Sequence, residues 1–272
     1  MKEKLWDDDD AAHYEDPVPS QSQLDAIRAI VDVLVELAGE GPALEFAIGT
    51  GRIGLRLAAR GVCVVGLENS TAMAGRLREK DPDERVPLTI GDMATERVAG
   101  SFQLVYLVFN TIGNLTTQDR QVACFANAAA HLRPGGFFLI ENTVPDLRRL
   151  PPGEDARVFA HAPGYIGYDR YTDLVAQYAV SHHFVARGNA VRESMTPWRF
   201  VWPSELDLMA QLAGMELHFR WADWDHSPFT GDSTKHVSVW RKVSDPHADD
   251  AHGPATRSTA TVAAQRSGGA GG

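Results

Sequence analysis

Short apolar runs alternate with stretches of helical periodicity through the first half of this sequence, and this order constrains the fold most strongly. The apolar runs are Ala43–Ala47, Val62–Leu67, Val86–Ile90, Phe102–Phe109 and Phe137–Glu141. The expected helices are Ser20–Leu37, Gly51–Arg60, Ser70–Lys80 and Thr117–Leu132. Buried strands that alternate with helices form βαβ units, which predicts a mostly parallel sheet covered on both faces. Right-handed crossovers make this a doubly wound α/β sheet.

The two ends of the chain differ in composition from the part between them. Residues 1–19 contain the acidic run Asp7–Asp10 where a signal peptide would need basic and then apolar residues, so we expect a cytoplasmic protein. Residues 244–272 are rich in Ala, Ser, Thr and Gly without apolar periodicity, which predicts a disordered tail. One folded domain is therefore expected over residues 20–243, with residues 1–19 as an entry segment before it.

Composition excludes several classes of function. The net charge is −10 and no basic stripe is present, which argues against a nucleic-acid partner. No run of about 18 apolar residues occurs, so no membrane span is expected. The two cysteines fit a reducing compartment and suggest neither a disulfide framework nor a metal site.

The residues after each predicted strand decide what the sheet binds, because ligands lie at the carboxyl ends of such strands. After the first strand comes Gly49-Thr50-Gly51-Arg52-Ile53-Gly54, which fits the G-x-G-x-x-G pattern. Glycine lets the backbone turn tightly and approach a nucleotide closely. The same pattern occurs in plain strand-to-helix turns, but its position between a strand and a helix favours a nucleotide-type cofactor.

Carboxylates and amides follow the next three strands. Glu68 comes after the second strand, where a carboxylate accepts hydrogen bonds from both ribose hydroxyls. Asp92 and Met93 follow the third strand and fit an adenine amine and ring, although an ordinary turn also explains them. The loop Asn110–Asn114 follows the fourth strand and is expected to face the same crevice.

Together these motifs resemble the class I S-adenosylmethionine-dependent methyltransferase family. The family's first motif is an acid followed by a glycine-rich turn, which reads here as Glu45-Phe46-Ala47-Ile48-Gly49-Thr50-Gly51. Ala47 stands where the family often has its first glycine. The resemblance covers residues 20–143 strongly and residues 200–243 more loosely, and it implies S-adenosylmethionine as the cofactor.

The resemblance also implies a Rossmann-like sheet of seven strands, mostly parallel, whose last strand is antiparallel and inserted between its neighbours. The closing part of the sequence fits, with a helix over Trp202–Ala213 followed by strands over Met215–Trp221 and Lys235–Val243. The cofactor-binding residues implied by the family motifs are Glu45, Ala47, Gly49, Gly51, Glu68, Asp92, Met93 and Phe109. A tyrosine near the N-terminus often folds over the cofactor in related enzymes, and Tyr14 is the candidate here.

Residues 144–200 differ in composition from the preceding part of the chain and are rich in tyrosine and histidine. We predict a strand-rich lid inserted after the fifth strand, which in this family often builds the pocket of the methyl acceptor. Histidine is the natural base near neutral pH, so His182 and His183 are the catalytic candidates, and adjacent strand residues cannot both face one pocket. Asn110 is the candidate that orients the acceptor. The alternative is that the histidines are structural and that the lid aromatics form a small core.

The sequence thus predicts an enzyme that transfers a methyl group from S-adenosylmethionine to a small molecule, with nitrogen or oxygen favoured over carbon as the acceptor atom. An NAD(P)-dependent oxidoreductase would share the glycine motif, but no tyrosine here is followed four residues later by lysine. A non-catalytic protein with the cofactor fold is a further alternative, disfavoured by the titratable groups of the lid. The acceptor and the oligomeric state stay open.

Overall fold

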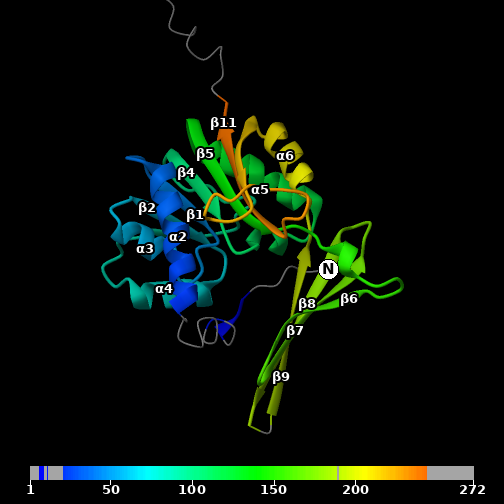
Figure 1. The fold of residues 1–272 in the computed structure, drawn as a ribbon. Helices are drawn as coiled ribbons and strands as arrows, with labels where there is room; N and C mark the ends of the chain where they lie inside the picture. The colour runs from blue at the N-terminus through cyan, green and yellow to red at the C-terminus, as the bar shows by residue number, and fades with distance from the viewer. Residues whose placement is uncertain (1–5, 9–10, 12–20, 189, 244–272) are drawn as a thin grey trace, which may run out of the picture.

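The protein consists of a central sheet covered by helices and a long antiparallel sheet that projects from one end (Figure 1). This computed structural model describes residues 6–8, 11, 21–188 and 190–243. The projecting sheet, Ala156–Arg199, is termed the arm below, and the rest is termed the body. The predicted tail, residues 244–272, lies outside the described residues.

The central sheet has seven strands in the order β10-β11-β5-β4-β1-β2-β3. Only β11 runs antiparallel to its neighbours, β5 and β10, so the predicted mostly parallel sheet with an inserted antiparallel last strand is confirmed. The strand order reverses between β1 and β4, and such a reversal opens a crevice for ligands. The strands are β1 (Ala43–Phe46), β2 (Val64–Glu68), β3 (Leu88–Ile90), β4 (Phe102–Leu107), β5 (Leu132–Thr143), β10 (Met215–Trp221) and β11 (Lys235–Lys242).

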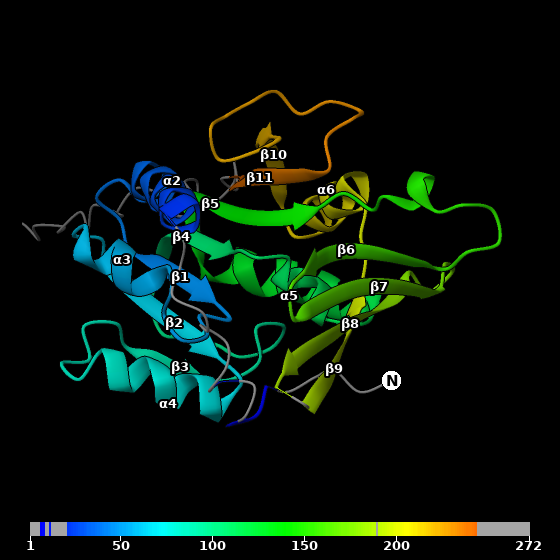
Figure 2. The same cartoon turned by 60° about the horizontal axis from the view of Figure 1, so that its bottom comes forward.

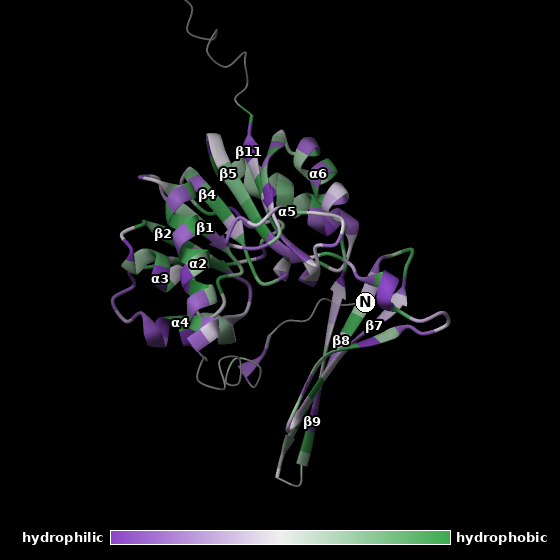
Figure 3. Cartoon of the chain, in the orientation of Figure 1, coloured by the Kyte–Doolittle hydropathy of each residue, from purple (hydrophilic) through white to green (hydrophobic). Residues whose placement is uncertain are grey.

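Helices cover both faces of this sheet because alternate residues of its strands are apolar on either side. One face packs on α2 (Gln21–Ala38), α3 (Gly54–Ala59) and α4 (Thr71–Lys80), and the other on α5 (Gln118–His131) and α6 (Pro203–Leu212). Figure 3 shows the resulting apolar strands at the centre of the body. None of the helices in the described part of the chain is long and apolar enough to cross a membrane.

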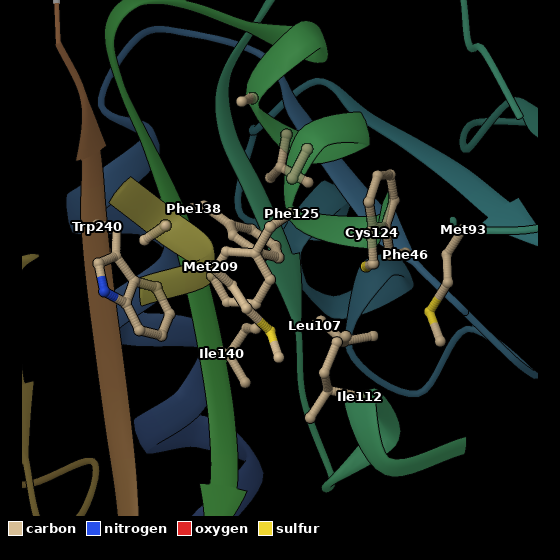
Figure 4. Packing of buried hydrophobic residues seen from close by; sticks show 14 of the residues in the cluster. Phe46, Met93, Leu107, Ile112, Cys124, Phe125, Phe138, Ile140, Met209 and Trp240 are labelled. Atoms are coloured by element: carbon tan, nitrogen blue, oxygen red, sulfur yellow. The ribbon is translucent and has the colours of Figure 1, made fainter. Parts of the chain in front are cut away.

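The core under α5 and α6 is aromatic. Phe125 of α5 packs edge-on against Phe138 of β5 and Trp240 of β11, with ring centroids 5.1 and 5.3 Å away. Figure 4 shows this cluster, which continues past Met209 of α6 to Phe46 of β1. All five side chains are almost fully buried, so this packing fixes the strands that carry the site.

Two predicted boundaries were wrong, and both differences have a backbone cause. The third helix begins at Gly54 and not at Gly51, because the residues between them form turns. Strand β5 begins at Leu132 and not at Phe137, since Pro134–Gly136 forms a bulge against β4 instead of a loop. A Cβ on Gly136 would lie 3.0 Å from the carbonyl oxygen of Gln103, so this bulge is tight for any residue larger than glycine. The remaining predicted bounds agree within two residues.

The arm confirms the predicted strand-rich insertion after the fifth strand. Its four strands pair in sequential antiparallel order and lie beyond the carboxyl end of β5 (Figure 2). One face carries a small cluster of Tyr171, Ala179, Trp198 and Phe200, and this face is termed the inner face. The strands are β6 (Ala156–Ala162), β7 (Tyr165–Asp173), β8 (Tyr178–Arg187) and β9 (Ala190–Arg199).

Candidate functional site

A cavity opens where the strand order reverses, at the carboxyl ends of the parallel strands. Its lining comes from the turn after β1, the ends of β2 and β3, the first helical turns of α4, and the loop after β4. Predicted cofactor residues that line it are Ala47, Gly49, Glu68, Asp92, Met93 and Phe109. Segments far apart in sequence thus meet at one cavity, as the sequence motifs predicted.

Glu68 is held in place by backbone amides at the end of β2. Its carboxylate accepts hydrogen bonds from the N–H groups of Gly49 and Ser70, each at 2.8 Å. The residue is 5% exposed, and burial raises the pKa of its carboxyl group. The carboxylate therefore joins the glycine-rich turn to β2 and presents a fixed acceptor at the cavity wall.

The turn after β1 uses left-handed backbone at three positions. Ala47, Gly49 and Gly51 have φ angles of 51°, 60° and 80°. A Cβ on Gly51 would lie 2.4 Å from Cδ1 of Leu77, so this position requires glycine for space as well as conformation. Ala47 adopts this conformation although its Cβ makes left-handed backbone less favourable than it is for glycine.

Glu45 lies behind this turn and not in the cavity lining. It is fully enclosed, and its Oε2 accepts a hydrogen bond from the Tyr106 hydroxyl at 2.9 Å. The N–H of Gly54 also donates to it, yet desolvation outweighs both bonds and raises the pKa of Glu45 to about 8. Its carboxyl group thus supports the turn from below.

Asp92 and Met93 line the cavity at the end of β3. Oδ1 of Asp92 accepts the N–H of Ala94 at 2.8 Å, while Oδ2 is bound by the guanidinium of Arg120. Met93 is almost fully buried beside them. An oriented carboxylate next to an apolar thioether is suited to a flat heterocycle that carries an amine.

Two consecutive residues after β4 adopt left-handed backbone, Phe109 at φ 59° and Asn110 at φ 58°. Glu141 of β5 accepts the N–H of Phe109 at 2.8 Å, and Oδ1 of Asn110 accepts the N–H of Thr143 at 2.6 Å. Such backbone costs about 1–3 kcal/mol per residue and concentrates at ligand sites. Phe109 thereby reaches the cavity, while Asn110 is used to join the loop to β5 and does not line the cavity.

The N-terminal segment reaches the cavity through Trp6. This side chain lines the cavity, and its carbonyl oxygen accepts the Ser70 hydroxyl at 2.6 Å. Tyr14, which the family resemblance suggested for this position, lies outside the described residues.

The two arm histidines lie on opposite faces of β8, as their adjacency requires. His183 is on the inner face, where its Nδ1 is 2.8 Å from the Tyr165 hydroxyl. His182 is on the outer face, where it stacks on Tyr168 at 4.6 Å between ring centroids. Neither side chain lines the cavity.

A short 3-10 helix, η1 (Thr111–Asn114), links the cavity to the arm. Thr111 and Asn114 line the cavity, whereas Gly113 backs onto the arm. A Cβ on Gly113 would lie 3.6 Å from Cβ of Trp198, so the inner face of the arm begins directly behind η1.

Sequence reasoning missed three residues that shape this site: Trp6, Arg120 and Glu141. Glu141 is a charged side chain at the end of an apolar strand, and that mismatch was the available signal, whereas Arg120 lies among polar residues in the first turn of α5 and offered no such signal. Trp6 offered only an aromatic residue in an acidic segment. Trp6 lines the cavity itself, Arg120 donates to Asp92, and Glu141 accepts the N–H of Phe109.

Comparison with known proteins agrees with this geometry. A family model for a methyltransferase domain matches residues 43–136. The chain is 26% identical over 200 residues to a cypemycin N-terminal methyltransferase from a Streptomyces species, covering 72% of this chain and 81% of that protein. It is 37% identical over 76 residues to a dTDP-3-amino-3,4,6-trideoxy-alpha-D-glucopyranose N,N-dimethyltransferase from Streptomyces venezuelae, covering 28% and 31% of the two chains.

The structure of the CcbJ methyltransferase from Streptomyces caelestis is similar along nearly its whole length. It shares 32% sequence identity with a TM-score of 0.80, covering 90% of this chain and 100% of that one. Similarity of this extent includes the arm as well as the body. From the fold, the cavity and these comparisons, the chain belongs to the class I S-adenosylmethionine-dependent methyltransferases and uses S-adenosylmethionine as its cofactor.

Proposed function

We propose that this enzyme methylates an amino nitrogen of a small molecule that binds between η1 and the inner face of the arm. The observation that carries the proposal is the shared position of η1, which lines the cofactor cavity with Thr111 and Asn114 and, at Gly113, lies close enough to the arm that a Cβ there would be 3.6 Å from Cβ of Trp198. An acceptor placed against this part of the arm is one short helical turn from the cofactor.

The chemistry of the inner face favours an amine. Asp169 of β7 accepts a hydrogen bond from the hydroxyl of Ser181, its partner across the sheet. It lies two residues before Tyr171 on the same strand, and therefore on the same face. Tyr165 and Trp198 lie on the same face. Aromatic rings and a carboxylate attract an amine that arrives as a cationic ammonium group, whereas a neutral hydroxyl gains less from them. The ammonium must release its proton to solvent before the nitrogen lone pair attacks the methyl group and the carbon–sulfur bond breaks. The names of the two curated relatives also specify amino groups, a peptide N-terminus and an amino sugar.

The protein's contribution is binding and orientation. When bound, S-adenosylmethionine supplies a methyl group that is already activated on a sulfonium. Glu68 would hold the ribose hydroxyls, Asp92 with Met93 the adenine, and the turn Ala47–Gly51 would pass under the methionine part. Correct placement of two reactants lowers a barrier by about 7–11 kcal/mol, so a dedicated catalytic triad is not required.

The proposed roles of the arm histidines differ. His183 lies two sheet steps, about 14 Å, farther along the inner face than Trp198. It is therefore proposed to contact the part of the acceptor remote from the reacting nitrogen. His182 faces away from this surface and is assigned no role in the reaction. Asn110 is proposed to position the loop that carries Phe109, and Tyr14 to close the cavity from the N-terminal side.

The test is methyl transfer to matched pairs of acceptors. Each pair consists of an amine and its hydroxyl analogue, drawn from amino sugars, amino sugar nucleotides and short peptides with a free N-terminus. Mass spectrometry measures the gain of a methyl group, and fragmentation locates it. We expect methylation on nitrogen in at least one amine and none in its hydroxyl partner. Transfer to hydroxyl analogues alone would overturn the proposal while leaving the cofactor assignment intact.

A further inference from the structure

One face of helix α5 holds the loop that follows β3. The side chains of Arg120, Asn127 and His131 lie on this face, because separations of seven and eleven residues return to the same side of a helix. The loop runs from Asp92 to Val98 and carries the residues proposed to bind adenine. None of the three helix residues was assigned a role by the sequence motifs.

The contacts follow one another along the loop. Nη2 of Arg120 donates to Oδ2 of Asp92 at 2.5 Å. Nδ2 of Asn127 donates to the carbonyl oxygens of Met93 and Glu96, each at 2.9 Å.

His131 completes the series at the end of the loop. The N–H of Val98 donates to its Nε2 at 2.8 Å, and its Nδ1 lies 2.8 Å from the carbonyl oxygen of Asn127. Asn127 and His131 are 3% and 2% exposed, so their hydrogen bonds are shielded from water.

The position of β3 explains why the loop needs a helix to hold it. Strand β3 has three residues, Leu88–Ile90, and forms the edge of the sheet, so only β2 pairs with it. The loop after β3 therefore has a strand neighbour on one side only. Hydrogen bonds from α5 supply the second support.

We propose that α5 acts as a positioning element for the adenine subsite, and that Arg120 sets the preference for adenine over a purine with a carbonyl at position six. The inference rests on the proposed contact between Asp92 and the adenine amine. One oxygen of Asp92 accepts the Ala94 N–H, and Arg120 fixes the other, so the carboxylate has one orientation toward the cavity. A fixed carboxylate accepts from the amine of adenine and repels the carbonyl oxygen of hypoxanthine.

The experiment compares S-adenosylhomocysteine with S-inosylhomocysteine, in which a carbonyl replaces the amine at position six and the neighbouring N1 carries a proton. Isothermal titration calorimetry gives the Kd of each for the wild type and for Arg120→Met, Arg120→Lys and Asp92→Asn. We expect the wild type to prefer the adenine ligand by about tenfold or more, the value of one hydrogen bond to a charged group. Arg120→Met should bring this ratio below about threefold, and Arg120→Lys should restore most of it.

The matched control is Arg60→Met, which breaks the ion pair between Arg60 and Asp32 at 2.6 Å on the surface of the body. It should leave both Kd values unchanged, and melting temperatures establish that every variant is folded. An equal loss of affinity for both ligands in Arg120→Met, with the ratio unchanged, would overturn the inference and make Arg120 merely structural.

A wild-type enzyme without preference, or an Asp92→Asn variant that retains the preference, would remove the adenine role of Asp92 and the inference with it. No methyl acceptor is present in these measurements, so their outcome is independent of the proposed amine substrate.

Discussion

The body and the arm differ in how much apolar side-chain packing they bury. The body buries two large apolar clusters, one on each face of its sheet, whereas the arm, in its described residues, contributes only Tyr171 and Ala179 to a small buried cluster that it shares with Phe200 just beyond its end. The arm instead exposes apolar residues such as Val158, Val191 and Met195. The cofactor thus has a closely packed site, while the proposed acceptor surface depends mainly on backbone pairing between strands.

A buried polar network joins the two regions. Arg199, at the end of the arm, is 3% exposed and pairs with Glu205 of α6 at 2.6 Å. It also donates to Gln121 of α5 and to Gln177 in the turn before β8. The arm is therefore attached to α5 and α6, which pack on one face of the central sheet. This attachment fixes the position of the end of the arm relative to the cavity.

The largest expected effect tests whether stability resides in the body. Trp240→Ala removes a fully buried ring that contacts Phe125 and Phe138, and should lower the free energy of unfolding by about 3–5 kcal/mol. Val191→Ala, at a position in the arm that is 68% exposed, should change it by less than about 0.5 kcal/mol. Urea denaturation measures both. A comparable loss in the two variants would contradict the contrast between the regions.

The second prediction concerns pH and the buried Glu45. Its pKa rises from 4.5 to about 8 on folding, so between these values the folded state holds a proton that the unfolded state has released. Its contribution therefore lowers stability as pH rises through this window, by up to about 1.4 kcal/mol per pH unit. Glu45→Gln should remove this slope and match the wild type near pH 5. Unfolding curves with the same pH slope in both proteins would count against it.

The third prediction concerns cofactor affinity. Glu68→Ala should weaken binding of S-adenosylmethionine by about 1.5–3 kcal/mol, or roughly 10- to 150-fold, because the variant lacks the carboxylate proposed to accept hydrogen bonds from the ribose hydroxyls. Calorimetry measures the Kd. The matched arm variant, Glu193→Ala on the outer face, should bind the cofactor like the wild type. Unchanged affinity in Glu68→Ala would refute the ribose assignment.

The smallest effects are expected in the arm. Once an acceptor is known, His183→Gln should raise its KM by about threefold to tenfold through loss of a neutral hydrogen bond, without changing the Kd of the cofactor. His182→Gln should leave both values unchanged, since His182 faces the opposite side of β8. Steady-state kinetics across pH provide the measurement. A fall in kcat of a hundredfold or more in His183→Gln would show instead that this histidine acts as a base.

The cofactor half of the protein was predictable because its signals are local. The turn Gly49–Gly51 requires positive φ within a few residues of a strand, while Glu68 ends β2 and Asp92 lies two residues after β3. Parallel strands bring their carboxyl ends to one edge, so positions along the chain translate into positions at the cavity. For this reason the order of strands and helices along the chain and most of the residues at the strand ends followed from the sequence, whereas the antiparallel last strand was implied by the resemblance to the family.

Other features depended on contacts between distant segments. Alternation in β8 requires His182 and His183 to face opposite ways, and the pairing of β8 with β9 puts His183 on the face of Trp198. Only packing of the arm against η1 decides that this face meets the body. Likewise, Arg120 meets Asp92 across 28 positions, and Glu141 meets Phe109 across 32. The sequence by itself therefore determined the succession of strands and helices along the chain and the residues at the strand ends, because periodicity and turn chemistry are local. Only the tertiary structure decided which face of the arm meets the body and which charged side chains hold the loops, because those choices depend on packing between elements that no local pattern encodes.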